Sequence, residues 1–139
     1  MIAAATAAID TSALLALASS RDQYHRTAVD VARRFRTRGG RWIATTLVLG
    51  ELHGHLLKRI GPAGARRVVE ALLADPIFVW HDASVELVRG AMDRWITRFA
   101  DQRFSLTDAV TFELMRMMNV RAAFAFDRDF TTAGYVLLD

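Results

Sequence analysis

The sequence predicts an α/β fold in which a short, mainly parallel sheet is flanked by helices. Short apolar segments alternate with longer segments in which apolar residues recur at helical spacing. The short segments are apolar on both faces, which is typical of parallel strands covered by helices on either side. The length of 139 residues fits one domain, so we expect residues 1–139 to fold as a unit.

The individual elements follow from the same patterns in chain order. Strands are predicted where apolar runs stand beside turn signals, over residues 2–9, 42–46, 77–80, 122–126 and 135–138. Helices are predicted over residues 11–20, 26–38, 46–59, 63–74, 84–100 and 105–119. Gly39-Gly40 ends the second helix and Gly61-Pro62 ends the third, because glycine and proline interrupt helical backbone.

Composition excludes several classes of protein. Hydrophobic residues make up 53% of the chain, which is too many for a disordered protein. The absence of cysteine excludes disulfides, thiolate catalysis and thiolate zinc sites, and it suits a cytoplasmic location. No apolar run approaches the ~20 residues of a membrane span. The apolar start of the chain lacks a basic region and is interrupted by Asp10, so we expect neither a signal peptide nor a membrane anchor.

Basic side chains are almost all arginine, since Lys58 is the only lysine, and the formal net charge is +3. The planar guanidinium pairs well with phosphate. One group of arginines could form an RNA-facing patch or simply a solvated helix face: Arg33, Arg34, Arg36, Arg38 and Arg41.

Four acidic residues stand where an apolar strand ends or a helix begins: Asp10, Glu51, Asp108 and Asp127. Parallel sheets bind ligands beyond the carboxyl ends of their strands, so the fold could bring all four to one edge. Crowded carboxylates repel each other unless a hard cation such as Mg²⁺ or Mn²⁺ binds them. This pattern predicts metal-assisted phosphodiester cleavage. Without metal, repulsion should raise some of the carboxyl pKa values.

Each of these acids also has an ordinary structural role open to it. Asp10 could cap the helix that follows it. Asp108 completes a capping-box pattern with Ser105, in which the acid reaches back to the start of the helix. Glu51 could be a solvated helix residue, and Asp127 could belong to a turn. Only the combination of the four favours a site.

At these residues the chain resembles a PIN domain, and most closely the VapC-type ribonuclease toxins of bacterial toxin–antitoxin pairs. The resemblance spans nearly the whole chain. Four segments carry it: Ile9-Asp10-Thr11-Ser12-Ala13-Leu14, Thr45-Thr46 with Glu51-Leu52, Phe104-Ser105-Leu106-Thr107-Asp108-Ala109, and Ala123-Phe124-Ala125-Phe126-Asp127-Arg128-Asp129-Phe130. The chain departs from many relatives at Phe126, where they have a small hydroxyl residue.

The resemblance implies a PIN-like three-layer sandwich and a Mg²⁺- or Mn²⁺-dependent endoribonuclease that hydrolyses RNA. By matching positions, the catalytic and metal-binding acids would be Asp10, Glu51, Asp108 and Asp127. Thr11 or Ser12 would orient Asp10 or the substrate. Apart from the resemblance, the position of Asp129 two residues after Asp127 suggests a supporting residue or an extra ligand, or simply an exposed side chain. The resemblance also implies a homodimer and a cognate antitoxin protein that holds the enzyme inactive.

Two other functions remain open. A non-catalytic binding module could keep the PIN fold, although the presence of all four acids counts against it. An aspartyl-phosphate phosphohydrolase could use Asp10 as its nucleophile. Such enzymes usually carry a second acid two residues later, where this chain has Ser12.

Overall fold

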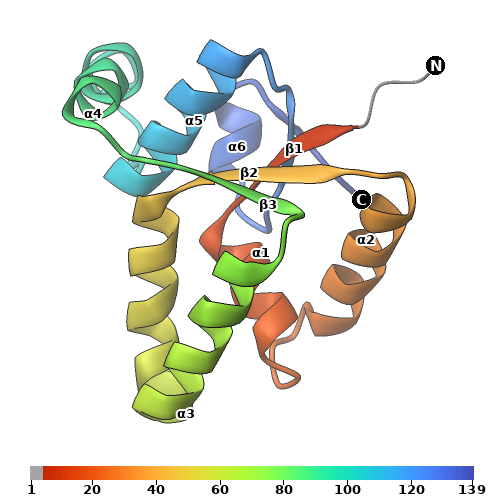
Figure 1. Ribbon diagram of the computed structural model, residues 1–139. Coiled ribbons are helices and arrows are strands. Elements are labelled where there is room, and N and C mark those ends of the chain that lie inside the picture. The colour runs from red at the N-terminus through yellow and green to blue at the C-terminus, as the bar shows by residue number, and fades with distance from the viewer. Residues whose placement is uncertain (1–4) are drawn as a thin grey trace.

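A five-stranded sheet forms the middle layer of the computed structural model, which describes residues 5–139 (Figure 1). The strands are β1 (Thr6–Ile9), β2 (Arg41–Thr45), β3 (Phe78–His81), β4 (Ala122–Phe124) and β5 (Val136–Leu137). Their spatial order is β3-β2-β1-β4-β5, and each neighbouring pair is parallel. The predicted α/β class is therefore confirmed. The chain builds outward from β1 in both directions, which makes the β1–β4 boundary a topological switch point.

Helices cover both faces of this sheet. They are α1 (Thr11–Ala18), α2 (His25–Thr37), α3 (Thr46–Ala74), α4 (Val85–Ala91), the π-helical turn η1 (Met92–Ile96), α5 (Leu106–Met118) and α6 (Asp129–Thr132). Figure 1 shows α1, α2 and α3 on one side of the sheet and α4, α5 and α6 on the other. The predicted three-layer sandwich is confirmed. Among the described residues, no helix combines the length and apolar character that a membrane crossing requires.

Two apolar cores fill the spaces between the three layers. Successive side chains of a strand point to opposite faces. Accordingly, Ile9 packs into the core under α1, α2 and α3, whereas Ala8 packs into the core under α4 and α5. In β2, Trp42 and Ile43 divide in the same way. Burying each large side chain of this kind contributes roughly 1.5–3 kcal/mol.

Most element boundaries differ from the predicted ones by a few residues. Helix α1 ends at Ala18 rather than at residue 20, and β5 covers only Val136–Leu137. Residues 2–4 of the predicted first strand lie outside the described residues. Strand β4 ends at Phe124 instead of residue 126. This early end leaves Asp127 beyond the sheet, on the turn that leads into α6.

The prediction of one long helix over residues 84–100 is wrong. Helix α4 ends at Ala91, and the chain continues through the π-turn η1 into turns. The backbone N–H and the hydroxyl of Thr97 both donate to the carbonyl of Met92, each at 2.9 Å, which widens the helix there. Apolar spacing in the sequence does not reveal such a bulge, because the bulge changes the backbone hydrogen bonds and not the order of apolar residues.

The break expected at Gly61-Pro62 is confirmed. Gly61 has a φ of 79°, a left-handed value that glycine adopts without strain. It divides α3 into two segments that correspond to the predicted helices over residues 46–59 and 63–74. Pro62 begins the second segment, where its missing N–H costs nothing. Helix α6 was not predicted, although its residue Phe130 is fully buried.

A pair of glycine substitutions tests how closely the first core is packed. A Cβ on Gly40 would lie 2.3–2.5 Å from three ring atoms of Phe35, and that ring stacks on Trp42 at a centroid distance of 3.9 Å. We expect Gly40→Ala to destabilise the fold by about 1–3 kcal/mol through overpacking. The matched change Gly54→Ala, in a helix with open space around it, should stabilise the fold by about 0.5–1 kcal/mol. Urea unfolding followed by circular dichroism measures both, and equal effects of the two changes would contradict this packing.

Candidate active site

Three of the four predicted acids converge at the carboxyl ends of the central strands. Asp10 follows β1, Asp127 lies just beyond β4, and Asp108 occupies the first turn of α5. One carboxylate oxygen from each lies within 4.8 Å of the others. Asp10 is only 4% exposed, and the other two are partly buried. The sheet edge at the switch point therefore concentrates negative charge in a confined space.

Glu51 lies on α3 and lines the same cavity, which has a volume of about 390 Å³. Its carboxylate is not part of the group within 4.8 Å. Asp129 also lines the cavity, as do the hydroxyl residues Thr11 and Ser12. All the predicted site residues thus line one cavity, and three of the acids lie close together in it.

Ser12 connects the ends of the two central strands. Its hydroxyl donates to Asp10 Oδ1 at 2.7 Å and accepts the backbone N–H of Phe126 at 3.0 Å. The backbone N–H of Ala13 donates to the same Asp10 oxygen at 3.2 Å, so Asp10 also caps α1. Both readings of Asp10 are therefore compatible, since capping occupies one oxygen and leaves the other available. The Thr11 hydroxyl is buried and has no hydrogen-bond partner among the described residues.

The remaining acids are positioned by short-range hydrogen bonds. Ser105 Oγ accepts the N–H of Asp108 at 3.1 Å and so caps α5. Within the described residues, the carboxylate of Asp108 makes no return bond to Ser105, so the predicted capping box is only half formed. Asp127 Oδ1 accepts the N–H of Asp129 at 2.8 Å. Both carboxylates keep oxygens that face the cavity.

Burial and mutual repulsion make the cluster difficult to ionise fully. Burial raises the pKa of Asp10 to about 7 and outweighs the hydrogen bonds from Ser12 and Ala13, and the charge of Asp127 adds to the rise. Burial also raises the pKa of Asp108 to about 7, helped by the charges of the neighbouring acids. The pKa of Asp129 is raised for the same two reasons. Some carboxyl pKa values are raised as predicted, but burial is the largest cause and the mutual repulsion adds to it.

The donor set fits a hard divalent cation. Carboxylate oxygens are the ligands that Mg²⁺ and Mn²⁺ prefer, and three of them lie within reach of one ion. A cation would replace the protons that otherwise limit the repulsion. The chain has no cysteine, and His55 lines the cavity without joining the three-acid group. The site is therefore suited to oxygen-ligated metals.

The arginines singled out in the sequence are not grouped at this site. Arg36 pairs with Asp75 at 2.7 Å, and Arg41 donates to the carbonyl of Pro76 at 2.7 Å. Arg38 lies over the ring of Phe35. Arg41 begins β2 and so lies at the amino ends of the strands, whereas the acids lie beyond the carboxyl ends. Three members of the group thus support the fold rather than line the acidic cavity.

The sequence did not single out Arg103, which lines the acidic cavity. The available signal was its position five residues before Asp108, in the segment that leads into α5. A larger cavity of about 630 Å³ lies between the end of α1 and α3. Its one carboxylate, on Asp22, lies 3.7 Å from a guanidinium nitrogen of Arg59, so it lacks a comparable group of acids.

Comparison with known proteins agrees with this geometry. The chain is 31% identical over 128 residues to the 23S rRNA-specific endonuclease VapC20 of Mycobacterium tuberculosis, covering 92% of this chain and 94% of that protein. The crystal structure of VapC20, described as a toxin that cleaves the sarcin–ricin loop, superposes with a TM-score of 0.81 at 29% identity over 93% of this chain and 95% of that one.

A more distant solved structure shares the fold. VapBC2 of Rickettsia felis, bound to a DNA fragment from its promoter, matches with a TM-score of 0.66 at 10% identity, covering 95% of this chain and 96% of the other. The model of the PIN domain matches residues 7–134. Because that match covers most of the chain, including all the cavity acids, this chain belongs to the PIN-domain family.

Proposed function

We propose that this protein is a divalent-metal-dependent endoribonuclease and the toxin of a toxin–antitoxin pair. The observation that carries the proposal is the group of three carboxylates within 4.8 Å at the switch point of the sheet. The sequence similarity to VapC20, a 23S rRNA-specific endonuclease, supports RNA as the substrate.

The chain's own residues would share the work at this site. Asp10, Asp108 and Asp127 would hold Mg²⁺ or Mn²⁺, and Glu51 would complete the wall on the side of α3. The bound cation would supply positive charge beside the phosphate and acidify the attacking water. Ser12 would keep Asp10 in place through the bond between their side chains. Asp108 would be held by the cap of α5, at a helix N-terminus that favours negative charge.

We further propose a structured ribosomal RNA as the target, because VapC20 is described as cleaving the sarcin–ricin loop. We also propose a cognate antitoxin and a homodimer. The solved VapBC2 assembly of Rickettsia felis supports the antitoxin.

The alternative functions fit the geometry less well. A phosphohydrolase would need Asp10 as an exposed nucleophile, yet Asp10 is 4% exposed and one of its oxygens accepts two hydrogen bonds. A non-catalytic binding module would have no use for crowded carboxylates whose pKa values are raised to about 7. A binding function without catalysis does not explain why the charges are gathered.

Replacing Asp10 by asparagine tests the proposed site. We expect Asp10→Asn to lower Mn²⁺-dependent cleavage of a sarcin–ricin hairpin by about 10²-fold or more, because it removes one charged ligand from the centre of the group. The chain should stay folded, since the amide is similar in size. Cleavage is followed on denaturing gels and folding by circular dichroism. Asp30→Asn, on the exposed face of α2, is the matched control and should cleave normally. Full activity of the Asp10 variant would rule the site out.

The raised pKa values predict how metal and pH act together on stability. An acid whose pKa rises from 3.8 to about 7 on folding lowers stability as pH rises through that window, because the unfolded chain ionises first. The metal-free protein should therefore lose stability between about pH 4 and about pH 7.

Bound metal should reverse that loss. We expect the rise in Tm on adding Mg²⁺ to be larger at about pH 8 than at about pH 5, where protons compete for the ligands. Scanning fluorimetry with Mg²⁺ or with a chelator measures the difference, and Asp10→Asn should reduce it. The same metal-induced rise at both pH values would contradict a carboxylate metal site.

A further inference from the structure

Arg103 is the one guanidinium among the described residues that line the acidic cavity. The cavity carries five acids: Asp10, Glu51, Asp108, Asp127 and Asp129. Its second basic group is His55, on α3. A lone arginine on such a wall is the natural partner of an anion that enters the cavity.

The backbone around Arg103 is held in place by its neighbours. Phe104 is 8% exposed, and its ring meets that of Phe112 edge-on at a centroid distance of 5.1 Å. Ser105 follows and caps α5 by accepting the N–H of Asp108. Arg103 therefore projects from an anchored segment, five residues before Asp108. Its side chain is exposed, whereas its backbone is held in place by the buried residue that follows.

The guanidinium of Arg103 is not used within the fold. Over residues 5–139, the ion pairs are made by other arginines: Arg36, Arg59, Arg66, Arg94 and Arg116. Within the same range, Arg103 has neither an ion pair nor a side-chain hydrogen bond to another residue. Its five N–H donors are thus available to a ligand, and a guanidinium can hold two oxygens of one phosphate at once.

We propose that Arg103 is a catalytic residue that binds the scissile phosphate of the RNA and stabilises the negative charge that grows on its non-bridging oxygens. This inference rests on the proposed ribonuclease function. The phosphate must approach a wall of carboxylates, and a cation bound at the acids would neutralise part of that negative charge. Arg103 supplies a directional pair of donors from an anchored segment of the cavity wall, and paired donors of this kind stabilise charge that develops in a transition state.

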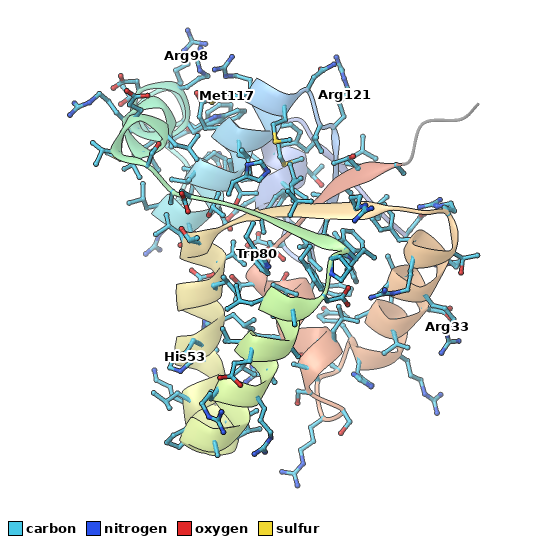
Figure 2. The ribbon with its side chains drawn as sticks, in the orientation of Figure 1. Arg33, His53, Trp80, Arg98, Met117 and Arg121 are labelled. Carbon is cyan, nitrogen blue, oxygen red and sulfur yellow. The ribbon has the colours of Figure 1, made fainter. Side chains whose placement is uncertain are left out.

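Matched arginine substitutions test the assignment. We expect Arg103→Gln to lower kcat for the sarcin–ricin hairpin by about 10²-fold with a smaller change in KM. Arg103→Lys should recover only part of the rate, because an ammonium lacks the paired donors. Guanidinium ion added to Arg103→Ala should raise its rate. Arg98→Gln is the control, since Arg98 extends into solvent from the turn after η1 and lies outside the cavity (Figure 2). Equal rates for wild type and Arg103→Gln would overturn the proposal.

Metal binding separates a role at the phosphate from a role in holding the site together. Calorimetry with Mn²⁺ should show equal or tighter binding by Arg103→Gln, because the change removes a positive charge near the acids. Weaker Mn²⁺ binding would show instead that Arg103 organises the cluster, and would overturn the proposal.

RNA binding distinguishes a failure of this inference from a failure of the proposed function. If the wild type cleaves no RNA, the ribonuclease function fails. Fluorescence anisotropy with the same labelled hairpin then decides on Arg103 as a phosphate ligand. Arg103→Gln should weaken binding by about 10-fold relative to Arg98→Gln. Equal affinities of the two variants would overturn the phosphate contact.

Discussion

The mutual repulsion of the carboxyl groups beyond β1 and β4 is the constraint on which the rest of this structure depends. Two unit charges 4.8 Å apart cost about 3 kcal/mol at an effective dielectric constant of ~20. Three such groups, one of them 4% exposed, would cost a large part of the stability of a small protein. The packing of both layers has to offset that cost, and protons or a cation have to limit it. The cluster is thus an unfavourable feature held in place by a sheet whose two faces are packed into apolar cores.

A second charged group, on the same helix as Asp108, shows how the fold holds the site in position. Glu113 is 3% exposed and accepts the indole N–H of Trp95 at 3.2 Å and two N–H groups of Arg116 at 3.0 Å each. A guanidinium nitrogen of Arg94 lies 3.2 Å away. Burial alone would raise the pKa of Glu113, but these donors and charges lower it. Glu113 therefore stays ionised and ties α5 to η1, whereas burial and the neighbouring charges raise the pKa values of Asp10 and Asp108.

The regular layers of this fold could be predicted from the sequence, whereas its irregular parts could not. Apolar runs and helical spacing were enough to predict the parallel sheet, the covering helices and the break at Gly61, because these depend on local pattern. The π-turn at η1 was missed because its hydrogen bonds leave the apolar spacing unchanged. The burial of Glu113 was missed because its partner Trp95 comes from a different element, 18 positions away. Pairings of that kind are visible only once the layers are assembled.

The candidate site likewise has features that could be predicted from local sequence and features that depend on tertiary packing. The meeting of Asp10, Asp108 and Asp127 could be predicted, because each stands at a strand end or a helix start and parallel strands share one carboxyl edge. The position of Glu51 outside this close group could not be predicted, since it depends on the angle at which α3 packs against the sheet. The structural use of Arg36 and Arg41 was hidden for a similar reason. Their partners are Asp75 and the carbonyl of Pro76, which directly follow the second segment of α3 and are distant in sequence.

These placements determine how the protein can attract an RNA chain. The net charge of +3 is small, and several of its arginines are engaged in supporting the fold. The metal-free cavity repels phosphate, so a cation and the RNA must bind with positive coupling. By linkage, the factor by which metal strengthens RNA binding equals the factor by which RNA strengthens metal binding. Fractional protonation of Asp10 and Asp108 near neutral pH weakens the repulsion that the empty site would otherwise carry. Partial protonation therefore limits the electrostatic cost of the metal-free site, and the full negative charge develops only when a cation binds.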